Sequence, residues 1–92
     1  MKFEWDKSKN EVNIRKHGID FMDVKEMFDH PMLTFLDDRE DYAEDRWIGM
    51  GWIKSLVGVV VYVERHHDGV RIISARKALK HEVRLYEKSI KN

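Results

Sequence analysis

The sequence predicts a single α+β domain over residues 1–92, in which a small antiparallel sheet of about four strands is packed by two N-terminal helices and one C-terminal helix. Four apolar runs, most of them joined by short connections, favour antiparallel hairpins. Helix-capping residues come before these runs, and apolar residues three to four positions apart follow them. A chain of 92 residues is long enough for one hydrophobic core and too short for two.

The first part of the chain predicts two helices. Residues 3–5 alternate apolar and polar side chains and are interpreted either as a short edge strand or as a hydrophobic anchor. Asp6 is a good N-cap and Gly18 a good residue to follow a helix, so a helix is expected over about residues 7–17. Asp20 can cap a second helix, which is expected to end just before the one proline of the chain.

Four strands are predicted after these helices, over residues 32–36, 46–53, 56–65 and 70–75. The second of them contains two glycines, which weaken a strand unless another group approaches closely. The third is apolar at nearly every position, which is typical of a strand covered on both faces. Asp68-Gly69 predicts a tight hairpin turn into the fourth.

The end of the chain predicts an amphipathic helix. Apolar residues recur there at spacings of four, four, three and four: Ala75, Leu79, Val83, Tyr86 and Ile90. The opposite side of this helix would carry a basic stripe formed by Lys77, Lys80, Arg84 and Lys88.

Composition narrows the setting of the protein. There is no cysteine, so neither disulfide bonds nor thiolate chemistry is expected. The N-terminal segment lacks the apolar core of a signal peptide, and the longest apolar run has eight residues, far fewer than the ~20 that a membrane-spanning helix needs. We therefore expect a soluble, cytoplasmic domain with no membrane association.

The net charge of zero conceals a segregation along the chain. Residues 1–19 carry a net charge of +2, residues 20–45 carry −8, and residues 46–92 carry +6. Such a division favours two surfaces, one able to attract a polyanion and one able to attract a basic protein. The alternative is a surface of mutually paired, solvated charges, which the sequence leaves open.

No familiar catalytic signature is present: there is no P-loop, no G-x-S-x-G and no H-E-x-x-H. His66-His67-Asp68 is interpreted as a solvated turn, because neighbouring residues of a hairpin turn project in different directions, and no metal or cofactor is expected. The remaining bases and proton carriers around the predicted sheet are Lys16, His17, Arg46, Glu64, Arg71, Arg76, His81 and Tyr86.

This set of residues suits metal-independent cleavage of RNA. In that reaction the ribose 2′-OH attacks the adjacent phosphate, which requires a base, an acid for the leaving oxygen and fixed positive charge. Arginine fits the last role because its planar fork matches two phosphate oxygens and stays protonated.

Each candidate also has a structural interpretation. His17 could simply face the negative end of the helix dipole, and Tyr86 falls on the core face of the last helix. In a regular strand Arg71 and Arg76 point to opposite sides, so one could serve a site while the other pairs with a carboxylate such as Glu82. Spacing alone favours structural roles for both arginines.

Three stretches of the sequence, taken together, resemble the BrnT family of toxins from type II toxin–antitoxin systems. They are "FEWDKSKNEVNIRKHGIDF", "EDRWIGMG" and "RIISARKALKHEVRLYE", and the resemblance extends over residues 3–87. The matching positions, in order, are Trp5, Asp6, Lys9, Asn13, Lys16, His17, Gly18, Arg46, Gly49, the run 71–76, Glu82 and Tyr86.

The resemblance implies a RelE-like α+β ribonuclease that blocks translation and arrests growth. It also implies a partner, a BrnA-type antitoxin of the ribbon-helix-helix class, in a heterotetramer that reaches promoter DNA only through the antitoxin. The activity residues carried over by position are Lys16, His17, Arg46, Arg71, Arg76 and Tyr86. With them, Lys77, Lys80, Arg84 and Lys88 are expected to contact flanking phosphates.

Two features depart from the family pattern. Trp47 stands where Tyr or Phe is expected, and residues 37–45, "DDREDYAED", are unusually acidic. The acidic segment could attract a basic antitoxin surface or keep RNA away from that side. Two other function classes remain open: a non-catalytic module that binds nucleic acid, and a domain that only binds a regulatory protein.

Overall fold

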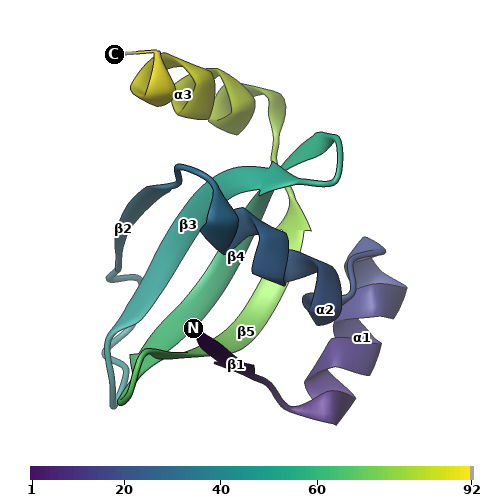
Figure 1. Ribbon diagram of the computed structural model, residues 1–92, viewed down its shortest axis with the longest axis vertical. Helices are drawn as coiled ribbons and strands as arrows, with labels where there is room; N and C mark the ends of the chain where they lie inside the picture. The colour runs from purple at the N-terminus through teal and green to yellow at the C-terminus, as the bar shows by residue number, and fades with distance from the viewer. Residues whose placement is uncertain (92) are drawn as a thin grey trace.

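The structure is a computed structural model that describes residues 1–91, and its centre is a sheet of five strands (Figure 1). The strands are β1 (Lys2–Glu4), β2 (Leu33–Asp37), β3 (Arg46–Ile53), β4 (Leu56–Arg65) and β5 (Gly69–Lys77). The helices are α1 (Lys7–His17), α2 (Phe21–Val24), the 3-10 helix η1 (Lys25–Asp29) and α3 (Lys80–Ile90).

The sheet is mixed rather than antiparallel throughout, which corrects the expectation of about four antiparallel strands. Its order is β1-β5-β4-β3-β2, and the last four strands form an antiparallel meander. β1 adds a parallel pair to the outer edge of β5, with Lys2 opposite Gly69. Residues 2–4 therefore form the edge strand that was one of the two interpretations, because the outer backbone groups of β5 need partners.

The two N-terminal helices begin where the capping residues predict. The Asp6 carboxylate accepts a hydrogen bond from the Lys9 backbone N–H at 3.0 Å, and Gly18 ends α1 in the left-handed region at φ 71°. Asp20 caps α2 in the same way through the Met22 N–H. The second helix has only four α-helical residues and continues as the 3-10 helix η1.

The core occupies both faces of the sheet. One face packs against α2 and η1, which lie in front of the sheet in Figure 1, with Phe21, Val24 and Met27 fully buried. The other face is covered only towards one end, where α3 packs over Met50 and Val59. The uncovered part of this second face, called the open face from here on, carries the candidate site.

The close approach expected at the glycines of β3 is present. A Cβ on Gly51 would lie 2.8 Å from Cγ of Met32, and one on Gly49 would lie 3.2 Å from its sulfur. The Met32 side chain therefore packs directly on the β3 backbone.

The junction between the last strand and the last helix differs from the prediction. Ala75 lies in the sheet core, β5 extends to Lys77, and α3 begins at Lys80 rather than near residue 75. The Glu82 carboxylate accepts the Leu79 backbone N–H at 2.8 Å, which places the start of the helix here. Leu79 is 56% exposed, so the apolar spacing that predicted the helix included two residues, Ala75 and Leu79, that lie before it.

The hairpin turn before β5 is also displaced. His67 and Asp68 take the left-handed conformation, with φ of 59° and 61°, while Gly69 already belongs to the strand. The two turn residues with positive φ are therefore His67 and Asp68, one position earlier in the chain than the predicted pair Asp68-Gly69. No helix within residues 1–91 is long and apolar enough to span a membrane.

A bulge in β5 determines where its two arginines point. The pairing with β4 shifts between Val61 and Tyr62, so that Ser74 is opposite Val61 while Ile72 is opposite Tyr62. Arg71 pairs with Val63 and Arg76 with Val59, and alternate residues of β4 share a face. Both arginines therefore project from the open face, whereas a regular strand would place them on opposite sides.

Candidate functional site

A groove of about 340 Å³ lies on the open face of the sheet, between the C-terminal end of α1 and the beginning of α3. Its floor is apolar and consists mainly of the side chains of Phe35, Ile48, Met50, Val59 and Val61. Its charged and polar lining is formed by Lys16, His17, Arg39, Ser74, Arg76 and Glu82. This combination of an apolar floor and a mostly cationic rim is the main candidate for a binding site.

Asn13 holds α1 against the strand that carries Arg76. Its side-chain amide donates to the Ala75 carbonyl at 2.9 Å and accepts the Ala75 N–H at 3.1 Å, so it bonds β5 much as a neighbouring strand would. The same amide nitrogen donates to the Ile19 carbonyl at 2.9 Å. Asn13 is 6% exposed, and within Lys7–His17 no other residue is buried.

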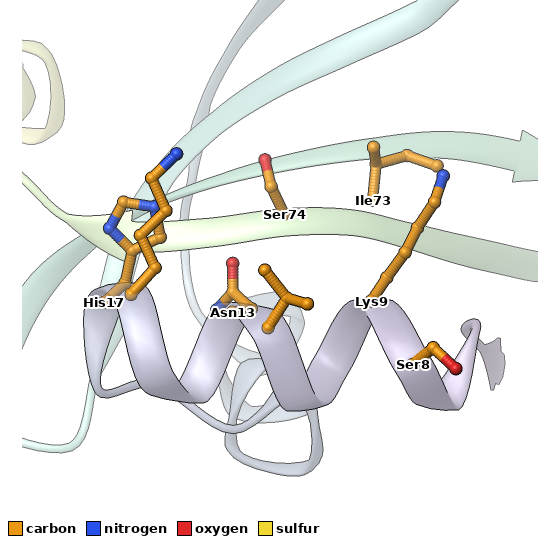
Figure 2. A pocket seen from close by; sticks show the side chains of 8 residues that line it. Ser8, Lys9, Asn13, His17, Ile73 and Ser74 are labelled. Carbon is orange, nitrogen blue, oxygen red and sulfur yellow. The ribbon is translucent and has the colours of Figure 1, made fainter.

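These hydrogen bonds of Asn13 fix the position of the last turn of α1. Figure 2 shows Lys9, Asn13 and His17 rising from one side of the helix towards the strand that carries Ile73 and Ser74. Residues four apart share a helix face, so the bond through Asn13 orients His17 towards β5. Lys16 and His17 are exposed and line the groove beside Ser74 and Arg76.

Arg76 and Glu82 form a two-pronged ion pair at the groove. The two terminal guanidinium nitrogens donate to the two carboxylate oxygens at 2.8 Å and 2.9 Å. The Arg76 side chain is 39% exposed and the Glu82 side chain 11%. Chiefly because of the hydrogen bonds from Arg76, the pKa of Glu82 falls from 4.5 to about 2, while the pKa of Arg76 is raised.

Arg39 is the second arginine of the groove, and it makes a similar pair. Its Nε and one terminal nitrogen each donate to the Asp37 carboxylate at 2.7 Å, and the Asp37 side chain is fully buried. These bonds hold the pKa of Asp37 at about 2. In both pairs the carboxylate lies behind its guanidinium group, so the surface exposed to solvent is cationic.

The other two arginines predicted for the site lie elsewhere. Arg46, directly opposite Asp37 in the β2–β3 pair, stacks its guanidinium carbon 4.2 Å from the centre of the Tyr42 ring. Arg71 donates to Glu4 at 3.3 Å. Neither lines the groove, although by register both share its face of the sheet.

Tyr86 also lies apart from the groove. It is 1% exposed, and its hydroxyl donates a hydrogen bond of 2.7 Å to the Pro31 carbonyl. Burial raises the pKa of the phenol. In this structure Tyr86 joins α3 to the segment that precedes β2.

The predicted basic stripe is divided between two elements. Lys77 is the last residue of β5, and three exposed residues of α3 carry the rest: Lys80, Arg84 and Lys88. None of the four lines the groove. They form a cationic surface on and next to the helix that borders it.

A second, shallower groove of about 330 Å³ adjoins the first along α1. The two share Lys16, His17 and Ser74, and the second adds Lys9, Val12 and Ile73 among its lining residues. His17 therefore stands where two depressions meet. An extended chain could pass from one depression into the other across this imidazole.

Among the residues of the groove that sequence reasoning missed, Arg39 and Phe35 matter most for binding. Arg39 was hidden in the acidic segment 37–45, where it is the only base, and that isolation was the available signal. Phe35 was assigned to a strand but to no site, because its position towards the open face depends on a register that the sequence does not contain. Within residues 1–91, no group of three or more His, Cys, Asp or Glu side chains gathers as metal ligands would.

Comparisons with known proteins identify a protein family and similar solved structures. Residues 5–82 match the family model described as "Ribonuclease toxin, BrnT, of type II toxin-antitoxin system". The fold is similar to the crystal structure of the Brucella abortus ribonuclease toxin BrnT, with a TM-score of 0.70 and 29% sequence identity over 87% of this chain and 99% of that one. No curated protein matches the sequence.

Proposed function

The chain belongs to the BrnT family of ribonuclease toxins of type II toxin–antitoxin systems, and on this premise we propose that it is a metal-independent endoribonuclease that inhibits translation and arrests growth. The observation that carries the proposal is the meeting of Lys16, His17 and Arg76 in one groove. Residues 1–92 act as one toxin domain in this proposal, and its relation to the RelE-like fold stays a prediction.

Cleavage in this groove begins with attack of a ribose 2′-OH on the adjacent phosphorus. His17 is the proton carrier: its imidazole takes the 2′-OH proton as the 2′-O–P bond forms, and the resulting imidazolium gives that proton to the 5′-oxygen as the P–O5′ bond breaks. The products are a 2′,3′-cyclic phosphate and a 5′-hydroxyl end. No metal ion is required, because the arginine and lysine side chains supply the positive charge.

Arg76 stabilises the charge that develops on the phosphate. Its terminal nitrogens are held by Glu82, so the guanidinium group is fixed in place before the substrate arrives. Arg39 and Lys16, on the same rim, add further positive charge. Support for metal independence comes from the carboxylates nearest the groove, Asp37 and Glu82, which are both engaged by arginines.

The remaining predicted site residues take outlying roles. Arg46 and Arg71 lie towards the far end of the open face, where they would contact phosphates away from the cleaved bond. Lys77, Lys80, Arg84 and Lys88 would contact the RNA backbone without reading bases. For Tyr86, whose hydroxyl is occupied by Pro31, we propose a role in anchoring α3 rather than in proton transfer.

The family also implies an antitoxin that neutralises the activity, together with an RNA substrate. We propose that the antitoxin is a BrnA-like ribbon-helix-helix protein, that toxin and antitoxin form a heterotetramer, and that promoter DNA is bound only through the antitoxin. The complex would act in the cytoplasm. The acidic segment 37–45 supports an antitoxin with a basic contact surface, through charge complementarity.

The first experiment measures cleavage of purified RNA by the isolated protein in EDTA. Replacing His17 by Ala or Arg76 by Lys should each lower the cleavage rate ~10²–10³-fold, the usual effect of removing one preorganised group. Arg76→Lys keeps the charge and removes the fork, so Glu82 is not left without a cation. His66→Ala, in the exposed β4–β5 turn, is the matched histidine control and should cleave at the wild-type rate.

The alternatives give different results. Equal cleavage by wild type and both groove variants would contradict the assigned roles and indicate another catalytic centre or a contaminating nuclease. RNA binding without cleavage would contradict the enzymatic proposal and favour the non-catalytic module.

A further inference from the structure

Phe35 exposes an aromatic ring in the floor of the proposed active site. It lies in β2 and is 39% exposed, in contrast to the fully buried Phe21 of the core. Its register partner is Ile48, and both line the groove together with Val61. The ring is therefore available to a ligand that enters the groove.

Positive charge surrounds this ring within the same groove. Arg39, two residues beyond the end of β2, lies on the rim, and Arg76 and Lys16 lie on the rim from β5 and α1. Arg39 and Arg76 line the same groove, so the two guanidinium groups lie on the same face of the sheet. A ligand that matches this arrangement has a flat apolar part and an anionic part next to each other.

A nucleotide has those two parts, and the groove has the appropriate size. Its volume of about 340 Å³ lies at the lower end of the ~300–1,000 Å³ range of ligand pockets, which suits a small ligand part such as a single nucleotide. Base-on-aromatic stacking tolerates any base, since every base has a π face.

We propose that Phe35 is the stacking platform for one unpaired base of the RNA substrate, so that the site accepts single-stranded RNA and rejects the duplex. This inference rests on the proposed ribonuclease function and adds its substrate class. In a duplex the bases are stacked inside the helix and cannot reach the floor, whereas the phosphates could still reach the rim.

The test uses a 2′-O-methyl oligoribonucleotide as the probe. Methylation blocks the attacking oxygen and keeps the bases and phosphates, so fluorescence anisotropy at fixed salt reports binding without cleavage. The same strand annealed to its complement is the duplex probe. The variants are Phe35→Ala, Phe35→Leu and Phe35→Trp, with unfolding in urea as the check that each one folds.

Leu36→Ala is the matched control, because Leu36 is the next residue of β2, is 47% exposed, and faces the opposite side of the sheet. Phe35→Ala and Phe35→Leu should weaken single-strand binding roughly 10-fold, Phe35→Trp should preserve it, and Leu36→Ala should match wild type. Wild type should bind the duplex more weakly than the single strand.

Several results would overturn the proposal. One is equal binding of the single strand by Phe35→Leu and wild type, and another is equal binding of duplex and single strand by wild type. A third is a Phe35→Leu variant that no longer binds the antitoxin but keeps its RNA affinity, which would assign the ring to a protein interface. The cleavage assay separates the two proposals. If wild type cleaves RNA but Phe35 does not affect binding, only stacking fails; if stacking is found without cleavage, only the nuclease proposal fails.

Discussion

Replacing Glu82 by Gln tests the ion pair that holds Arg76 in place. Glutamine has nearly the same shape and keeps an oxygen for the Leu79 N–H, so the change removes mainly the negative charge. At the 1.4 kcal/mol that corresponds to each pKa unit, a shift from 4.5 to about 2 amounts to roughly 3 kcal/mol. Because the Arg76 side chain is 39% exposed, water screens the pair, and we expect a loss of about 2 kcal/mol.

The effect should depend on pH in a defined direction. The pKa of Glu82 is lower in the folded than in the unfolded protein, so the extra stability is fully present above pH 4.5 and is lost as the pH falls towards 2. Urea and thermal unfolding, each followed by tryptophan fluorescence at pH 7 and pH 3, measure the change in free energy and in melting temperature. At pH 7 the melting temperature should fall by about 8–16 °C, and the gap between variant and wild type should be smaller at pH 3.

Glu87, on the same helix and exposed, provides the matched control as Glu87→Gln. It should change stability by less than about 0.5 kcal/mol. The reasoning would be refuted by a Glu82→Gln protein as stable as wild type at pH 7, or by a loss of equal size at pH 3 and pH 7. In the RNA assay Glu82→Gln should lower the rate at saturating substrate more than it raises KM, since a looser Arg76 still attracts phosphate.

Two further predictions concern side chains that position the site. Asn13→Ala should lower the free energy of unfolding by roughly 2–3 kcal/mol and impair cleavage, because it removes three hydrogen bonds and leaves the N–H and C=O of Ala75 unpaired. Thermal melting measures the stability and the EDTA assay measures the cleavage. A stable, fully active variant would contradict the role given to Asn13. Tyr86→Phe should lower the free energy of unfolding by about 1–2 kcal/mol, because the Pro31 carbonyl loses its hydrogen-bond donor, and the variant should cleave RNA like wild type. A variant that folds but does not cleave would instead identify Tyr86 as a proton donor.

Local signals predicted local structure well. Asp6, Gly18 and Asp20 mark the helix boundaries because their side chains or backbone act on residues two to four positions away. The glycines of β3 correctly indicated a close approach, although only the structure identifies Met32 as the group that approaches.

Non-local pairing accounts for the differences. The parallel β1–β5 pair joins the N-terminal residues to a strand that begins at Gly69, and nothing in residues 2–4 alone specifies that partner. The bulge in β5 reverses the side of the sheet on which Arg76 would lie in a regular strand, and a pattern of alternation cannot reveal an extra residue. Spacing favoured structural roles for Arg71 and Arg76; the ion pair with Glu82 was anticipated as one possibility, but the shared open face was not.

The candidate site shows the same division. Lys16, His17 and Arg76 line the groove, whereas Arg46, Arg71 and Tyr86 lie outside it. The resemblance supplies positions without distances, so it cannot separate residues that touch a substrate from residues that support the fold. Their roles stay predictions until the variants are measured.

The bond between Asn13 and Ala75 joins residues 62 positions apart, and this separation has a consequence for synthesis of the protein. As the chain leaves the ribosome, α1 emerges long before the strand to which it is clasped, and an isolated 11-residue helix is marginal in water. A nascent chain that carries Lys16 and His17 therefore has no Arg76 to face them. On the proposed function, the toxin becomes active only when nearly all of it has been made, and incomplete products of a stalled ribosome are harmless to the cell that makes them.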